Sequence, residues 1–183
     1  MKKNLLSLSM LVSLSLASIV SQAATTTVTG GTVNFLGTIV NAACSVNSHS
    51  TNQSVQLGQV RSARMDTVGN TSNGVGFNIV LDDCDTSVSG TAAISFSGVT
   101  TSSNNTALQL SSSSASGNAT GVGIQILDKS GTPLALDGTA WSAAHTLING
   151  TNTLPFQARY ITTSLPVSPG VANSIANFNV QYI

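Results

Sequence analysis

Apolar residues recur at every second position in short stretches along most of this chain. Val75–Leu81 carries four of them on one face, and the C-terminal stretch Ala176–Tyr182 has the same alternation. No long stretch shows the period of a helix, and turn-forming pairs such as Asn149-Gly150 separate the alternating stretches. About eight to ten short strands at this spacing predict an all-β sandwich.

Two of the expected strands have features that bear on their place in a sheet. Ser54–Val60 alternates Val55 and Leu57 with polar residues and glycine, so we expect a strand there. Pro155 lies near the start of a later strand, and proline lacks the N–H group that a β-ladder needs. It therefore predicts that this strand begins at a sheet edge or at a bulge.

Residues 1–23 are typical of a secretion signal. Lys2 and Lys3 precede the apolar stretch Leu5–Val20, and a cleavage site of small residues ends at Ala23. The apolar stretch is too short and too rich in serine for a comfortable membrane span. We therefore expect an exported mature chain in which residues 37–183 form one domain.

Charge is nearly absent from the rest of the chain. Past residue 23 there are four Lys and Arg residues, six Asp residues and no Glu, which gives a net charge of −2. Nucleic acids and anionic membranes bind basic patches, so this balance argues against both as partners. It also gives little electrostatic protection against self-association.

Cys44 and Cys84 are the only cysteines. In the oxidising compartment that an export signal implies, two cysteines most simply form one disulfide bond. Such a bond closes a loop of about 40 residues and contributes about 4 kcal/mol in the chain-entropy model. The alternative is a pair of free, buried thiols.

The segment Ala24–Leu36, between the signal and the first cysteine, is uncharged and rich in Thr and Val, which favour strands. Gly30 and Gly31 weaken a strand that stands alone, but they let another backbone or a shallow pocket come close. We interpret the segment as a strand that serves a different copy of the protein. The alternatives are an ordinary first strand of its own sandwich and a loose terminal tail.

Six stretches spread over the mature chain match a known family in order and spacing. They are residues 40–44 (VNAAC), 55–60 (VQLGQV), 75–79 (VGFNI), 82–85 (DDCD), 122–128 (VGIQILD) and 152–160 (NTLPFQARY). Tyr182 is second from the end and Gly170 is fourteenth from the end, as in that family. Together these features resemble the major subunits (fimbrillins) of type 1 fimbriae, in the chaperone–usher pilin family of Gram-negative bacteria.

The resemblance implies an immunoglobulin-like sandwich that lacks its last strand and has an apolar groove beside its C-terminal strand. A periplasmic chaperone fills this groove first, and at an outer-membrane usher the N-terminal extension of another subunit replaces the chaperone. By this resemblance the donor-strand residues are Thr26, Val28, Gly30 and Thr32. The groove edge and chaperone contacts are Gly170, Ala176, Phe178, Val180, Tyr182 and Ile183, with the terminal carboxylate as an anchor for the chaperone.

The opposite face of the extension is the more hydrophobic of the two. It consists of Thr27, Thr29, Gly31, Val33 and Phe35. The residues themselves leave the choice between the two faces open. We favour the face of Val28 and Gly30 on the resemblance alone, because in the family a glycine of this pair enters a shallow pocket.

Enzyme chemistry is the main alternative class, in the form of a secreted β-sandwich hydrolase. The chain has no Gly-x-Ser-x-Gly motif, and His49 and His145 both lie in polar sequence that we expect to form loops. Asp82, Asp83 and Asp85 are more typical of a solvated strand end than of a calcium loop, because the chain has no Glu for the last ligand. We therefore expect no catalytic residue, metal site, cofactor or small-molecule substrate.

These features predict a structural subunit of a fimbrial shaft that polymerises with other copies of itself and supports cell adhesion. Export through the periplasm would place it in the fimbria on the cell surface. A minor or adaptor pilin of the same fibre shares the fold and the extension, and it remains an alternative. A tip adhesin is disfavoured, because the pilin-like sequence begins soon after the cleavage site and leaves no room for an added lectin domain.

Overall fold

The computed structural model describes residues 25–111 and 117–183, so the predicted signal peptide and Ala24 lie outside the described part of the chain. The chain divides into two units, Met1–Thr38 and Ile39–Ile183. Residues 25–38 have no helix or strand, and their side chains are exposed, including those of Val28 and Phe35. Among the described residues, no helix is long and apolar enough to cross a membrane.

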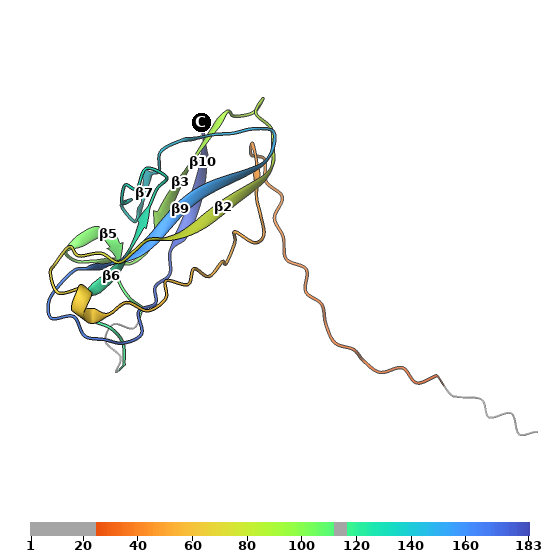
Figure 1. The fold of residues 1–183 in the computed structure, drawn as a ribbon. Helices are drawn as coiled ribbons and strands as arrows, with labels where there is room; N and C mark the ends of the chain where they lie inside the picture. Colours follow the sequence, from red (N-terminus) through yellow and green to blue (C-terminus); the bar gives the residue numbers. More distant parts are fainter. Residues whose placement is uncertain (1–24, 112–116) are drawn as a thin grey trace, which may run out of the picture. The chain divides into compact units, whose positions relative to one another are not determined.

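The unit Ile39–Ile183 contains two antiparallel sheets (Figure 1). The larger sheet has the strand order β1-β2-β9-β6-β5-β4, and the smaller has the order β10-β3-β7, with β8 also paired to β3. The larger sheet consists of β1 (Ser45–Val46), β2 (Val75–Cys84), β9 (Gly150–Thr162), β6 (Val122–Leu127), β5 (Asn104–Leu108) and β4 (Thr100–Thr101). The smaller consists of β10 (Asn177–Tyr182), β3 (Thr91–Ser97), β7 (Asp137–Trp141) and β8 (His145–Thr146). A short 3-10 turn, η1 (Ser62–Arg64), lies in the connection from β1 to β2.

The core of this unit is built from the alternating apolar residues of both sheets. Ile79 of β2, Leu154 of β9 and Ile94 of β3 are each no more than 1% exposed. The rings of Phe96 on β3 and Phe156 on β9 meet edge to face, with centroids 5.2 Å apart. Strands from both sheets thus contribute to one core, and the predicted all-β sandwich is confirmed.

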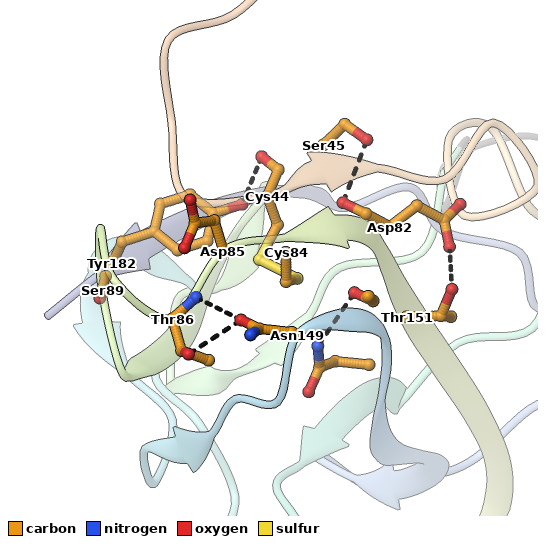
Figure 2. The surroundings of a disulfide bond; sticks show 12 residues. Cys44, Ser45, Asp82, Cys84, Asp85, Thr86, Ser89, Asn149, Thr151 and Tyr182 are labelled. Atoms are coloured by element: carbon orange, nitrogen blue, oxygen red, sulfur yellow. Dashed lines mark hydrogen bonds between the residues drawn. A yellow bond between two sulfur atoms is a disulfide. The ribbon is translucent and has the colours of Figure 1, made fainter.

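Cys44 and Cys84 form the predicted disulfide bond, which spans 40 residues of sequence. Figure 2 shows the bond at the end of β2, where Cys84 also pairs with Gly150 at the start of β9. The Tyr182 hydroxyl donates a hydrogen bond of 3.0 Å to the carbonyl oxygen of Cys44. The disulfide and this hydrogen bond join the segment before β1 to the ends of β2 and β10.

Pro155 of β9 lies beyond the point where the neighbouring strand β6 ends. Pro155 pairs with Asn78 of β2, but the ladder between β9 and β6 stops at the pair of Gln157 with Leu127. The Asn78 carbonyl accepts a hydrogen bond of 3.2 Å from the Gln53 side chain and so points away from β9. The nitrogen of Pro155 therefore faces the side that β6 no longer covers. This is the local sheet edge that the sequence predicted.

Ser54–Val60 differs from its prediction, because it forms no strand. Val55 and Leu57 are half-buried, as the alternation requires, but the backbone of the segment makes no hydrogen bond to any other described residue. The reason is the absence of a partner within the described chain. The outer edge of β2 pairs only with the two-residue strand β1, whose partners are Asp82 and Leu81.

Candidate functional site

β10 is an edge strand whose outer side has no partner among the described residues. It pairs with β3 alone, in antiparallel register. Phe178, Val180 and Tyr182 are half-buried and pack against the core, whereas the residues between them are exposed. An unpaired edge beside a partly covered apolar face is a place where another strand adds to a sheet.

Ser54–Val60 provides a second backbone that is unpaired among the described residues. Leu57 packs against the same core as Phe178, and Val60 is 37% exposed. Phe77 of β2 is also only half-buried. Its ring contacts the ring of the buried Phe96, with centroids 6.1 Å apart. We call this set of partly buried apolar side chains, contributed by β10, by Phe77 and by Ser54–Val60, the open groove.

A pocket of about 460 Å³ opens at the end of Ser54–Val60. Gly58–Val60 lines it from one side and Val167–Asn173 from the other, with Val122 and Tyr160 contributed by the larger sheet. The Tyr160 hydroxyl donates a hydrogen bond of 3.1 Å to the carbonyl oxygen of Ala172. Burial raises the pKa of Tyr160, and the hydrogen bond joins the larger sheet to this part of the lining.

The structure brings most of the expected groove residues together. Ala176, Phe178, Val180 and Tyr182 are all partly buried and packed against the core. Gly170 lies in the pocket lining instead, where a Cβ atom would sit 2.3 Å from the carbonyl carbon of Asn118. The close approach of the two backbones therefore requires glycine at this position.

Ile183 continues the pairing of β10 with β3 beyond the end of the strand. Its N–H donates to the Thr91 carbonyl at 3.0 Å, and its own carbonyl oxygen accepts from the Thr91 N–H at 3.3 Å. The same oxygen accepts hydrogen bonds from the Ser89 hydroxyl at 2.7 Å and the Thr91 hydroxyl at 3.0 Å. The chain terminus is thus held by β3, while the Ile183 side chain is 65% exposed.

Sequence reasoning missed the residues that line the pocket opposite Gly170. Gly58–Val60 was expected to be the end of a strand, and Tyr160 was given no place in a pocket. The available signal was Gly58, which interrupts an alternating stretch and adopts a φ of +70°. A glycine at the end of such a stretch indicates a bend rather than a continuing strand.

The family model described as "Fimbrial protein" matches residues 33–183. The chain belongs to this family. It is 52% identical over 182 residues to "Type-1 fimbrial protein, A chain" of Escherichia coli strain K12, and the match covers 100% of both chains. It is also 52% identical over 182 residues to "Fimbrial subunit type 1" of Klebsiella pneumoniae, again with 100% of both chains covered.

Solved structures agree with this assignment. A chain from the structure of a chaperone–usher pilus that concerns rod uncoiling matches with a TM-score of 0.72 and 28% identity, covering 88% of this chain and 100% of that one. The P pilus rod subunit PapA matches with a TM-score of 0.66 and 26% identity, covering 78% and 100%. The resemblance to type 1 fimbrial subunits and the predicted pilin fold are therefore confirmed.

The two histidines weighed for enzyme chemistry have different surroundings in this fimbrial protein. His49 is exposed and contacts Asn47, whereas His145 is buried against Phe156 with ring centroids 6.0 Å apart. Asp82 accepts hydrogen bonds from Asn47 and Thr151, as Figure 2 shows in part. Within residues 25–111 and 117–183, no group of three His, Cys, Asp or Glu side chains is placed to hold a metal ion.

Acid is expected to destabilise this fimbrial protein through His145. Burial, and then the positive charge of Lys129, lower the pKa of His145 below its ordinary 6.5, against an opposing effect of Asp128. Its buried Nε2 atom has no hydrogen-bond partner among the described residues. The unfolded chain therefore takes up the proton first, and stability falls as pH drops below 6.5 and through the folded pKa.

Urea unfolding at about pH 7.5 and about pH 5 checks this expectation. The His145→Gln variant should lose less stability between the two pH values than the wild type does. His49→Gln should keep the wild-type difference, because His49 is exposed. Asp85 and Asp137, whose pKa values are lowered below 3.8 by hydrogen bonds, titrate outside this window. A wild-type stability equal at both pH values would contradict the role of His145.

Proposed function

We propose that this fimbrial protein is a structural subunit of the shaft of a chaperone–usher fimbria, and that its copies join by strand exchange. The observation that carries the proposal is the open groove, in which apolar side chains are only partly buried and two backbone segments have an unpaired side. A strand inserted there gains backbone hydrogen bonds and covers residues such as Phe178. The full-length similarity to type 1 fimbrial subunits supports a place in the shaft.

The occupant we propose for the open groove is the segment Ala24–Leu36 of another copy. The side chains of this segment are uncharged, so burying them removes no ionised side chain from water. Its apolar side chains, where the structure describes them, are exposed and can pack against another copy. Val28 is 79% exposed and Phe35 is 91% exposed. It also lies outside the loop closed by Cys44 and Cys84, so its departure opens no part of the core.

The face of the donor that we propose to enter the groove consists of Thr26, Val28, Gly30 and Thr32. A Cβ atom built on Gly30 meets nothing within 4 Å, and the same holds for Gly31. Their own chain therefore gives no packing reason for the glycine pair. A contact with another copy, where a side chain would collide with the pocket beside Gly170, supplies such a reason.

We propose two further partners, a periplasmic chaperone and an outer-membrane usher. A chaperone strand would occupy the open groove before assembly, when the half-buried residues of β10 would otherwise favour aggregation. The terminal carboxylate at Ile183, at the end of this edge strand, is the anchor that we propose for the chaperone. Export by this route places the subunit in a surface fimbria, where it has a structural rather than an enzymatic role in cell adhesion.

A synthetic peptide of residues 24–36 is expected to stabilise the chain that lacks this segment. A ligand that binds only the folded state raises its stability by about 4 kcal/mol at a thousandfold excess over its dissociation constant. Thermal melting with and without the peptide measures this effect. A peptide with Gly30 replaced by leucine is the matched control and should stabilise much less. An unchanged melting temperature with the native peptide would remove strand exchange as the mechanism.

A further inference from the structure

The two ends of the folded unit Ile39–Ile183 carry charged side chains of opposite sign. β9 connects these ends, because Gly150 pairs with Cys84 at the disulfide and Thr162 donates a hydrogen bond of 3.2 Å to the Met65 carbonyl just after η1. Its 13 residues span about 40 Å at the usual rise of a strand. In Figure 1 the yellow η1 turn marks one end of the unit, far along β9 from the other.

The disulfide end is acidic. Asp82, Asp83 and Asp85 surround Cys84, and the last two are exposed. The Asp85 carboxylate accepts hydrogen bonds from Ser87, which lower its pKa. Two exposed apolar side chains accompany these charges.

The two exposed apolar side chains at the acidic end are Val88 and Ile148, each 65% exposed. Thr86 donates hydrogen bonds of 2.8 Å from its N–H and hydroxyl to the Asn149 side chain, which holds the loops of Val88 and Ile148 together. Figure 2 shows Thr86 and Asn149 beside the disulfide. The acidic end therefore has an apolar component of its own.

The η1 end is basic and has a hollow. Arg61 and Arg64 are exposed, and neither guanidinium makes a hydrogen bond or ion pair with another described residue. Asp66 offsets one of these charges and accepts a hydrogen bond of 2.9 Å from Asn70. Next to them lies a hollow of about 560 Å³ whose lining includes Leu165, which is 53% exposed.

We propose that the acidic end of one copy docks against the basic end of the next, with Asp83 and Asp85 facing Arg61 and Arg64. This inference rests on the proposed head-to-tail assembly, in which opposite ends of successive copies meet. Opposite charges favour that joining, whereas joining two disulfide ends would bring like charges together. The exposed apolar side chains of the acidic end complement the hollow at Leu165.

The contact acts mainly on the rate and direction of assembly. Exposed ion pairs contribute little to affinity, but complementary charged surfaces speed association and disfavour wrong orientations. Strand exchange then supplies the lasting attachment. The two contributions can therefore be measured separately, as a growth rate and as the stability of the finished fibre.

Growth of fibres from the purified mature chain tests the contact. We expect R61E/R64E to slow growth about tenfold at low ionic strength, and added salt to remove most of the difference. D83N/D85N should slow growth less, because it removes an attraction without creating a repulsion. Asparagine suits both sites, since Asp83 has a φ of +52° and the Asp85 side chain caps Ser87.

The quadruple variant provides the decisive comparison. Adding D83N/D85N to R61E/R64E should recover part of the lost rate, because the new acidic residues then face neutral ones. D137N, which removes one acidic charge from β7, should grow like the wild type. Fibres of R61E/R64E, once formed, should resist heat as wild-type fibres do.

The possible failures are distinguishable. A wild-type chain that forms no fibre at all would overturn strand exchange and this contact together. Wild-type fibres with variants that grow at the wild-type rate at low ionic strength would overturn only the charged contact. Additive effects in the quadruple variant would also overturn it, because residues that face each other couple.

Discussion

Replacing both Cys44 and Cys84 with serine is expected to lower the free energy of unfolding by about 4 kcal/mol. The bond closes a 40-residue loop, and for a loop of this length the entropy that it removes from the unfolded chain is worth about 4 kcal/mol. A domain of this size has a total stability of about 5–15 kcal/mol. The variant should therefore unfold at a much lower urea concentration, as measured by circular dichroism.

Two comparisons separate this effect from lost packing. Cys44 and Cys84 are 4% and 5% exposed, so the serine hydroxyls enter a buried site. In the first comparison, the disulfide of the wild-type protein is reduced before the unfolding measurement. The reduced protein keeps its buried thiols and should show most of the same loss in the free energy of unfolding. If the reduced protein were as stable as the oxidised one while the double-serine variant was not, packing rather than loop closure would explain the result.

The alternation of the sequence predicted the core because side-chain direction in a strand is a local property. Ile79 and Leu81 lie on the buried face of β2 whatever strand pairs beside it. Pro155 was also informative for a local reason, because a residue without an N–H cannot serve two ladders. The face of β10 that carries Phe178 and Val180 followed in the same way.

Pairing partners could not be predicted from such local patterns. Ser54–Val60 has the alternation of a strand but pairs with no strand among the described residues, and nothing within the segment reveals that absence. His145 was expected in a loop, yet it begins the short strand β8 and is 8% exposed. Its burial depends on Phe156 and on pairing with Ala92, which are distant in sequence. The pocket beside Gly170 likewise forms only when three remote segments meet.

Replacing Gly30 with leucine is expected to block fibre assembly while leaving the subunit folded. A side chain forced into a filled contact costs about 1–3 kcal/mol, which corresponds to roughly a 5- to 150-fold loss of affinity for each donor strand. Nothing in its own chain lies within 4 Å of a Cβ atom at this position, so the melting temperature of the monomer should stay unchanged. Electron microscopy and sedimentation of the mature chain measure assembly, and thermal melting measures folding.

Gly37 is the matched comparison for this change, because a Cβ atom there also meets nothing within 4 Å and its φ lies outside the left-handed region. Gly31 gives the comparison on the opposite face, although its φ of +128° adds backbone strain to any substitution there. Gly37→Leu lies outside the proposed donor and should assemble like the wild type. Gly31→Leu places its side chain on the opposite face of the strand and should reduce assembly less than Gly30→Leu does. If Gly31→Leu blocked assembly and Gly30→Leu did not, the face of Val33 and Phe35 would be the one that enters the groove. If neither change affected assembly, this segment would not be the donor, because a bulky side chain on one face or the other must meet the groove.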